Sequence, residues 1–255
     1  MQTHISKLPS PEFVLSTLHP TTANPTSVVA DASGATPTSF VPRARYCIHR
    51  GFWASLPPNS QNEAEKNPPI YESDLFTFTT DKRMEKVQDL ESAGGEGGKV
   101  EAVFWVKDVM TQWRIKGRAF VLGEGGEAEE GKRQQIRSWM RRTKDDGEED
   151  GWSWDREITA HFGNLSPGMR GSFRNPPSGT PVSEPLKNKE WGLGQKVEDL
   201  EDEVARENFR VVVIRPGEVE QVDLTDPSRA RRWRWEFIGA SPGDERGWKV
   251  EELWP

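Results

Sequence analysis

The feature that most constrains the fold is a series of short segments rich in β-branched and aromatic residues, separated by turn-forming residues. Segments of this length and composition are typical of antiparallel strands with short connections. The predicted strands cover residues 13–18, 44–49, 75–80, 100–107, 113–122, 209–214, 219–224, 233–238 and 248–253. Helical periodicity is confined to residues 82–90, 133–141 and 154–162, which is too little for a series of βαβ crossovers. The sequence therefore predicts a mainly β fold, a barrel or a sandwich with a few helices.

Turns and polar insertions divide these strands. Pro216-Gly217 is predicted to form the turn between two strands, and so is Pro242-Gly243. Longer polar, Gly- and Pro-rich or acidic insertions lack apolar periodicity and are interpreted as loops or disordered segments. They lie at about 20–40, 57–69, 91–98, 123–131, 144–151 and 174–206. For a chain of 255 residues we predict a single domain, 1–255, that carries these insertions.

Charge and cysteine content exclude several classes of protein. Lys and Arg number 34 against 41 Asp and Glu, and the net charge of −7 disfavours general binding of nucleic acid or anionic membranes. A single cysteine, Cys47, excludes an internal disulfide, and the four histidines show no metal-ligand spacing. No apolar run approaches the length of a membrane span and no secretory signal is recognisable. We therefore expect a cytoplasmic protein without a metal, a membrane or a nucleic-acid partner.

The segment that points to chemistry runs from a Thr-rich strand into a predicted helix. Arg83 and Lys86 lie three residues apart, so that a helix over 82–90 places both on one face. The hydroxyls of Thr79 and Thr80 and the free N–H groups of the first helical turn add further donors. Such an arrangement suits a phosphate dianion. The alternative is a surface helix that Asp81 caps and whose cations are solvated.

Two further residues carry weaker signals. Arg45 projects from a predicted strand and could clamp a phosphate, or it could be an edge-strand arginine that faces solvent. Gln112 lies at the junction of two strands, where its carboxamide could contact the edge of a heterocycle or simply belong to a turn.

A family resemblance is carried by the order of the motifs along nearly the whole chain outside the insertions. The matching segments are residues 13–18, 42–45, 78–86, 105–117, 165–173, 176–181, 208–209, 216–220, 229–232 and 248–255. Taken in this order they resemble the pyridoxamine 5'-phosphate oxidase superfamily, and most closely its branch of pyridoxamine-phosphate-oxidase-like FMN-binding domains. The resemblance implies a split β-barrel, FMN as the cofactor, and a homodimer that binds FMN between its protomers.

The resemblance also implies roles for individual residues. Arg45, Arg83 and Lys86 would hold the FMN phosphate, and Thr79 and Thr80 would lie beside the ribityl chain. Gln112 would face the flavin ring, and Arg231 or Arg232 would approach its pyrimidine edge. Ser166 and Phe209 would come from the second protomer. The implied activity is that of an FMN-dependent oxidoreductase passing a hydride between a small substrate and flavin. The alternative is a non-catalytic flavin- or vitamin-binding module, a carrier or a sensor.

Three departures from the family pattern bear on these roles. The oxidases carry Ser-Arg-Lys at the phosphate, whereas this chain has Met84-Glu85-Lys86 with Arg83 before it. Their substrate-binding Arg-x-His is replaced by Arg229-Ala230-Arg231, which argues against pyridoxamine phosphate as the substrate. Only about ten residues precede the first predicted strand, so that the N-terminal helix of the family is short or absent.

Two competing interpretations remain. Cys47 and His49 share a predicted strand face and could form a nucleophile–base pair. The stretch 229–235 could be a nucleic-acid-binding stripe of arginines and tryptophans. Strand alternation instead places Trp233 and Trp235 in the core and the arginines outside, and we favour that interpretation.

Overall fold

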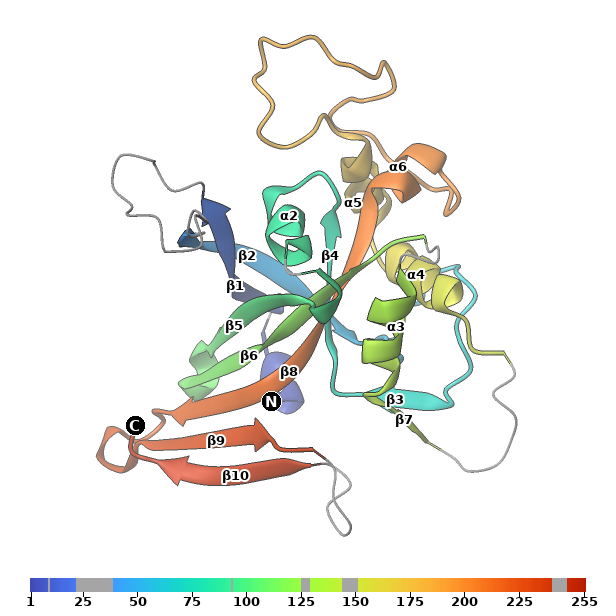
Figure 1. Cartoon of the computed structure of the whole chain (residues 1–255). Coiled ribbons are helices and arrows are strands. Elements are labelled where there is room, and N and C mark those ends of the chain that lie inside the picture. The colour runs from blue at the N-terminus through green and yellow to red at the C-terminus, as the bar shows by residue number, and fades with distance from the viewer. Residues whose placement is uncertain (9, 22–38, 93, 125–128, 144–150, 240–246) are drawn as a thin grey trace, which may run out of the picture. The chain divides into compact units, whose positions relative to one another are not determined.

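The computed structural model describes residues 1–8, 10–21, 39–92, 94–124, 129–143, 151–239 and 247–255. Its strands are β1 Glu12–Thr21, β2 Ser39–Phe52, β3 Tyr71–Ser73, β4 Phe76–Asp81, β5 Gly98–Val106, β6 Thr111–Leu122, β7 Met140–Arg142, β8 Phe209–Asp223, β9 Arg231–Phe237 and β10 Trp248–Leu253 (Figure 1). Its α-helices are α1 Gln2–Ile5, α2 Glu85–Glu91, α3 Glu130–Arg137, α4 Trp154–Gly163, α5 Pro167–Gly171 and α6 Glu203–Asn208. The fold is mainly β, as the sequence predicts, and α1 is the short N-terminal helix.

The chain divides into two compact units. The first comprises Met1–Cys47, Gln88–Arg118 and Gly217–Pro255, and the second comprises Ile48–Val87 and Ala119–Pro216. Three strands, β2, β6 and β8, contribute residues to both units. Each unit is described by itself below, and a single domain over 1–255 stays a prediction.

The first unit is built from antiparallel strands with one buried face. β1 pairs with β5, with Val14 opposite Val103 and Leu15 opposite Ala102. Phe13, Leu15 and Thr17 are buried and alternate with more exposed neighbours, which is the period of two expected for a half-buried sheet. The C-terminal part of β8 pairs with β9, and β9 pairs with β10.

The second unit has β4 at the centre of its sheet. β4 pairs with the end of β2 on one side and with the first half of β8 on the other. Five of its six residues are buried, because a central strand is covered on both faces. Helix α4 and the segments around it supply a large aromatic core that includes Trp53, Phe162 and Phe209.

Strand β8 corrects one prediction from the sequence. We expected two strands separated by a turn at Pro216-Gly217, whereas Phe209–Asp223 is one continuous strand. It pairs with β4 as far as Ile214 and with β9 from Glu218 onward. Pro216 lies where β8 changes partner, so its missing N–H removes no hydrogen bond from either of these two ladders. The other predicted turn, Pro242-Gly243, lies outside the described residues.

Two further expectations also differ from the structure. The helix predicted over 133–141 is α3, which ends at Arg137, and Met140 begins the short strand β7. Trp233 and Trp235 are half-buried rather than enclosed in the core, although the Trp235 ring stacks on Trp113 at 5.9 Å. Most side chains on both faces of β9 are half-buried, so buried and exposed residues do not alternate along this strand as predicted.

Two of the predicted insertions lie entirely within the described residues. Segment 57–69 has no helix or strand, yet Asn62 and Asn67 donate hydrogen bonds to α4 and to the residue before it. Segment 174–206 runs as turns and bends until α6 begins at Glu203. Residues 22–38, 93, 125–128 and 144–150 of the other insertions fall outside the described residues. Among the helices described here, none has the length and apolar character that crossing a membrane requires.

Candidate functional site

Four of the predicted site residues, Thr79, Thr80, Arg83 and Lys86, lie in the second unit between the end of β4 and the first turn of α2. β4 ends at Asp81 and α2 begins only at Glu85, so Arg83 lies in the intervening turn. Asp81 forms this turn: its carboxylate accepts the backbone N–H of Arg83 at 2.8 Å, and its carbonyl accepts the N–H of Met84 at 3.1 Å. The expectation that Arg83 and Lys86 share one face of a first helical turn is therefore wrong, because the helix starts after Arg83.

The Arg83 guanidinium is held among partners of its own unit. Nε and Nη2 donate to the Asp81 carboxylate at 2.9 and 2.5 Å, and Nη2 also donates to the Phe173 carbonyl at 3.1 Å. The guanidinium lies over the Trp191 ring, 5.3 Å from its centroid. Its Nη1 is buried and has no hydrogen-bond partner among the described residues. Arg83 is thus not a solvated surface cation, and one of its nitrogens remains able to donate to a further acceptor.

Lys86 contacts a separate set of residues. Its Nζ donates to the hydroxyl of Thr80 at 3.2 Å and lies 2.8 Å from Sδ of Met84. Thr80 is buried and its neighbour Thr79 is half-buried. Because successive side chains of a strand point to opposite faces, Thr79 does not share the side of β4 on which Thr80 meets Lys86. The structure therefore brings Thr80 and Lys86 together.

Arg45 belongs to a polar cluster in the first unit that sequence reasoning missed. Its guanidinium donates to the Thr17 hydroxyl at 2.6 Å and to the Asp89 carboxylate at 3.2 Å. Asp89 also accepts from Thr17 at 2.6 Å and lies 2.7 Å from Nδ1 of His19. Burial raises the pKa of Asp89, but the hydrogen bonds from Thr17 and His19 and the charge of Arg45 outweigh it, and the net pKa is lowered. Sequence reasoning missed Asp89 because its partners Thr17 and His19 on β1 lie 72 and 70 residues earlier in the chain, and no local sequence pattern links them.

Gln112 lies on a charged face of the first unit. On β6 it alternates with buried residues and shares its face with Arg114 and Lys116. Arg114 donates to Glu101 at 2.6 Å, and Lys116 donates to Glu218 at 2.5 Å. These ion pairs join β5, β6 and β8 across one sheet face.

The two candidate arginines on β9 are both paired with carboxylates. Arg232 donates to Glu220 at 2.6 Å, and its Nε is buried without a hydrogen-bond partner among the described residues. Burial raises the pKa of Glu220, but the hydrogen bond from Arg232 and the charges of Lys116, Arg232 and Arg114 together have the larger effect. The net pKa is lowered, so the carboxylate stays ionised. Arg231 is exposed and donates to Glu252 at 2.8 Å. Of the two, Arg232 is the one held in a partly buried charge network.

Ser166 and Phe209 have local roles in the second unit. The hydroxyl of Ser166 accepts the backbone N–H of Met169 at 3.3 Å and caps α5. The Phe209 ring is 1% exposed and packs edge-on against Phe162 and Phe173, with centroids 5.1 and 5.2 Å away. These contacts account for both side chains without a ligand.

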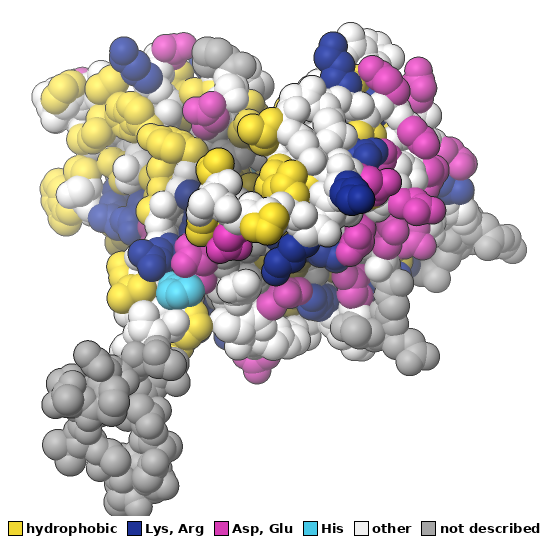
Figure 2. Space-filling view, turned by 90° about the horizontal axis from the view of Figure 1, so that it is seen from above, with side chains coloured by type: hydrophobic (Ala, Val, Ile, Leu, Met, Phe, Trp, Pro, Cys, Tyr) yellow, Lys and Arg dark blue, Asp and Glu magenta, His cyan; other side chains and the backbone are white. Residues whose placement is uncertain are grey.

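The geometry supports neither a Cys47–His49 nucleophile–base pair nor a nucleic-acid-binding stretch at 229–235. Cys47 is buried, and burial lowers the pKa of His49 to about 4, so that its imidazole is a poor proton acceptor at neutral pH. In the arginine-rich stretch, Arg234 pairs with Glu251 at 2.6 Å, as Arg232 does with Glu220. On the face drawn in Figure 2, basic side chains lie among acidic and hydrophobic ones. Paired arginines of this kind are less available to nucleic-acid phosphates.

Comparison with known proteins supports the resemblance seen in the sequence. Residues 1–123 match the family model described as pyridoxamine 5'-phosphate oxidase, FMN-binding domain. A pyridoxamine 5'-phosphate oxidase-related, FMN-binding protein from Nostoc punctiforme is similar in structure, with a TM-score of 0.54 and 15% identity over 100% of this chain and 93% of that one. At this identity the likeness concerns the fold, and it confirms the predicted fold class.

Two other solved structures are more distant. PhzG from Burkholderia lata, solved with tetrahydrophenazine-1-carboxylic acid, has a TM-score of 0.46 and 14% identity over 95% of this chain and 81% of that one. General stress protein 26 from Bacillus anthracis has a TM-score of 0.34 and 12% identity over 86% and 88%. No curated protein matches this chain in sequence.

Proposed function

Because residues 1–123 match the family model described as pyridoxamine 5'-phosphate oxidase, FMN-binding domain, we propose that this chain is an FMN-dependent oxidoreductase acting on a small substrate. The cofactor of this domain family is FMN. The observation that carries the proposal is the end of β4, where a buried threonine hydroxyl meets the ammonium of Lys86. Bound flavin would supply the acceptor or donor of a hydride, which is chemistry that no side chain provides.

The donors at the end of β4 fit a phosphate group. A phosphate oxygen would accept a charge-assisted hydrogen bond from Lys86 Nζ, which is stronger than the one that Lys86 donates to the neutral hydroxyl of Thr80. Arg83 Nη1 is a buried donor without a described partner. Asp81 orients the Arg83 guanidinium through two hydrogen bonds. We assign Lys86, Thr80 and Arg83 to the phosphate, and the roles of Arg45 and Thr79 stay predictions from the resemblance.

The contacts of Gln112 and of Arg231 or Arg232 with the flavin ring stay predictions from the resemblance. Gln112 offers both a donor and an acceptor on a partly exposed face of the first unit. Of the two arginines, Arg232 is held by Glu220 and retains a buried Nε without a described partner, and a cation so fixed can stabilise negative charge at a heterocycle edge. Ser166 and Phe209 are occupied locally, and their flavin contacts stay predictions.

The proposal is tested by the preference of the protein for FMN over riboflavin. The two ligands share the ring and differ in the phosphate. We expect FMN to bind more tightly than riboflavin by about 100-fold or more, because only FMN can form the charge-assisted hydrogen bonds to the phosphate. The measurement is quenching of flavin fluorescence on titration with protein. Equal affinity for the two ligands would exclude a phosphate site. Bound FMN that stays oxidised with every amine, alcohol and reduced nicotinamide supplied would favour the carrier or sensor.

We also propose that two copies of the chain associate through one sheet face of the first unit. Leu18, Tyr46 and Trp105 are exposed by 42, 76 and 43% and come from β1, β2 and β5, which are neighbouring strands. Leu18 and Trp105 alternate with buried residues, so both lie on the face opposite the core. Large apolar side chains exposed on the outer face of a sheet favour an interaction surface. A homodimer is also what the family resemblance implies.

Replacement of Tyr46 by glutamate is expected to convert the dimer into a monomer. The substitution places a charge on the proposed interface, where desolvating it is costly. The matched control is Val182→Glu, because Val182 is fully exposed in a loop of the second unit. Size-exclusion chromatography with light scattering gives the mass of each variant. A monomeric parent protein, or a dimeric Tyr46→Glu, would contradict this assignment.

A further inference from the structure

A cavity in the second unit is lined by segments that take no part in the proposed flavin site. Its volume is about 370 Å³, at the lower end of the range for small-molecule sites. Its walls come from the loop after β2, the second half of the 57–69 insertion, β3 and helix α4. The residues that line it include Ala54, Ser55, Leu56, Pro58, Lys66, Asn67, Pro69, Tyr71, Glu72, Thr143, Glu157 and Ala160.

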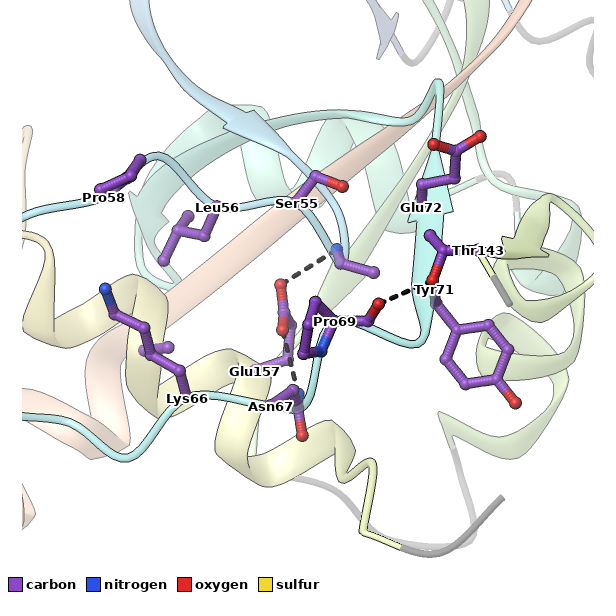
Figure 3. Close-up of a pocket in the computed structure, with 12 residues that line it drawn as sticks. Ser55, Leu56, Pro58, Lys66, Asn67, Pro69, Tyr71, Glu72, Thr143 and Glu157 are labelled. Atoms are coloured by element: carbon purple, nitrogen blue, oxygen red, sulfur yellow. Dashed lines mark hydrogen bonds between the residues drawn. The ribbon is translucent and has the colours of Figure 1, made fainter. Parts of the chain in front are cut away.

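Glu157 places a buried carboxylate at this cavity. Its side chain is 5% exposed, and its two oxygens accept hydrogen bonds from the backbone N–H of Ala54 and from Nδ2 of Asn67, each at 3.0 Å. Figure 3 shows the carboxylate between the two loops that carry these donors. Both oxygens act as acceptors, as in an ionised carboxylate, and each retains a second lone pair.

Within the described part of the chain, the Glu157 carboxylate has no strong cationic partner. No Lys or Arg of the described residues forms an ion pair with Glu157, and Figure 3 shows the Lys66 side chain extending away from it. Nδ1 of His161 lies 3.9 Å from Oε1, but burial lowers the pKa of His161, and the imidazole is neutral at neutral pH. Buried charges in proteins are ordinarily paired. A ligand that brings a positive charge to the Glu157 carboxylate would supply the partner that the described residues do not provide.

We propose that this cavity binds a small organic molecule through a protonated amine, which donates to Glu157 while its apolar part lies against Leu56, Pro69 and Tyr71. The apolar wall and the single buried acceptor together select an ammonium group on a compact hydrocarbon or aromatic body. The site is independent of the proposed flavin function and shares no residue with it.

The test compares benzylamine with benzyl alcohol, which have the same ring and differ in charge. Binding to the purified protein is measured by isothermal titration calorimetry at neutral pH. We expect benzylamine to saturate one site and benzyl alcohol to bind about 10-fold more weakly or not at all, because a hydrogen bond to a charged group is the stronger one. Equal affinities for the two probes, or no binding of benzylamine at millimolar concentration, would overturn the proposal.

Three variants locate the binding within the cavity. Glu157→Gln is expected to reduce benzylamine affinity about 10-fold or more, because it removes the charge from the acceptor. Ser55→Trp is expected to abolish benzylamine binding, because the larger side chain would fill the cavity that Ser55 lines. Ser55 is exposed, so this variant provides the test if Glu157→Gln does not fold. Glu72→Gln is the matched control, because that second acidic lining residue is exposed and lies 3.4 Å from Arg141. Unchanged binding in Ser55→Trp, or an equal loss in Glu72→Gln, would refute the assignment.

Discussion

Replacement of Lys86 by methionine is expected to weaken FMN binding by about 10- to 100-fold while riboflavin binding stays as in the parent protein. Methionine retains most of the aliphatic stem and removes only the ammonium group. A hydrogen bond to a charged partner contributes about 1.5–3 kcal/mol, which corresponds to this range of affinities. The ammonium of Lys86 donates to Thr80 Oγ1 at 3.2 Å, and Thr80 lies at the end of β4 where we propose that the phosphate binds. Titration of flavin fluorescence with FMN and with riboflavin separates the phosphate contribution from that of the ring.

The matched control for this experiment is Lys82→Met, four residues earlier. Lys82 pairs with Glu207 at 2.7 Å, and both side chains are substantially exposed. An ion pair of this kind contributes little to stability, and this cation is directed to a carboxylate. We expect FMN affinity to stay within about 2-fold of the parent, since the control removes a charge of the same sign from the same segment. Equal losses in the two variants would attribute the effect to net charge and not to a phosphate site.

Replacement of Trp53 by alanine is expected to lower the free energy of unfolding by about 3–5 kcal/mol. The Trp53 side chain is fully buried, stacks on His161 at 5.6 Å and packs against Trp154 at 5.4 Å. Its removal leaves a cavity in a core that relaxes only in part, and the lost contacts and the cavity both contribute to the cost. Denaturation in urea, followed by far-UV circular dichroism, measures the change.

Trp254→Ala and Trp53→Phe are the controls for this prediction. Trp254 is 94% exposed, so its removal is expected to change stability by no more than about 0.5 kcal/mol. Trp53→Phe keeps an aromatic ring and removes Nε1, which is buried without a hydrogen-bond partner among the described residues. We expect it to cost less than the alanine variant, because part of the loss in ring volume is offset by removing an unsatisfied donor. A Trp53→Ala protein as stable as Trp254→Ala would show that this aromatic cluster does not stabilise the unit.

The elements that the sequence predicts correctly are those with a local signal. The β1 segment is short and contains β-branched residues, which favours a strand, and the structure buries Phe13, Leu15 and Thr17 on one side. Helix α4 begins at the predicted position because Ser153 caps it, accepting the backbone N–H of Arg156. Both depend on residues within a few positions of one another. The family resemblance, likewise a property of sequence order, is matched by residues 1–123.

One error arose where a local signal competed with distant partners. Pro216-Gly217 has the composition of a turn, yet β8 continues through it because β4 and β9 supply pairing before and after. Here tertiary contacts outweighed a propensity of about 1 kcal/mol or less per residue. The error at Arg83 has a local cause, because the carboxylate of Asp81, two residues earlier, holds the backbone N–H of Arg83 in a turn before α2 begins.

By itself, the amino-acid sequence determined the mainly β fold class and the positions of most strands. These follow from periodicity and spacing, which act over a few residues. Only the tertiary structure decided that Arg45 is held by Asp89, that Arg232 is held by Glu220, and that Glu157 reaches a cavity without a counter-charge. The physical reason is that ion pairing and burial depend on segments that are far apart in the chain and meet only when it folds.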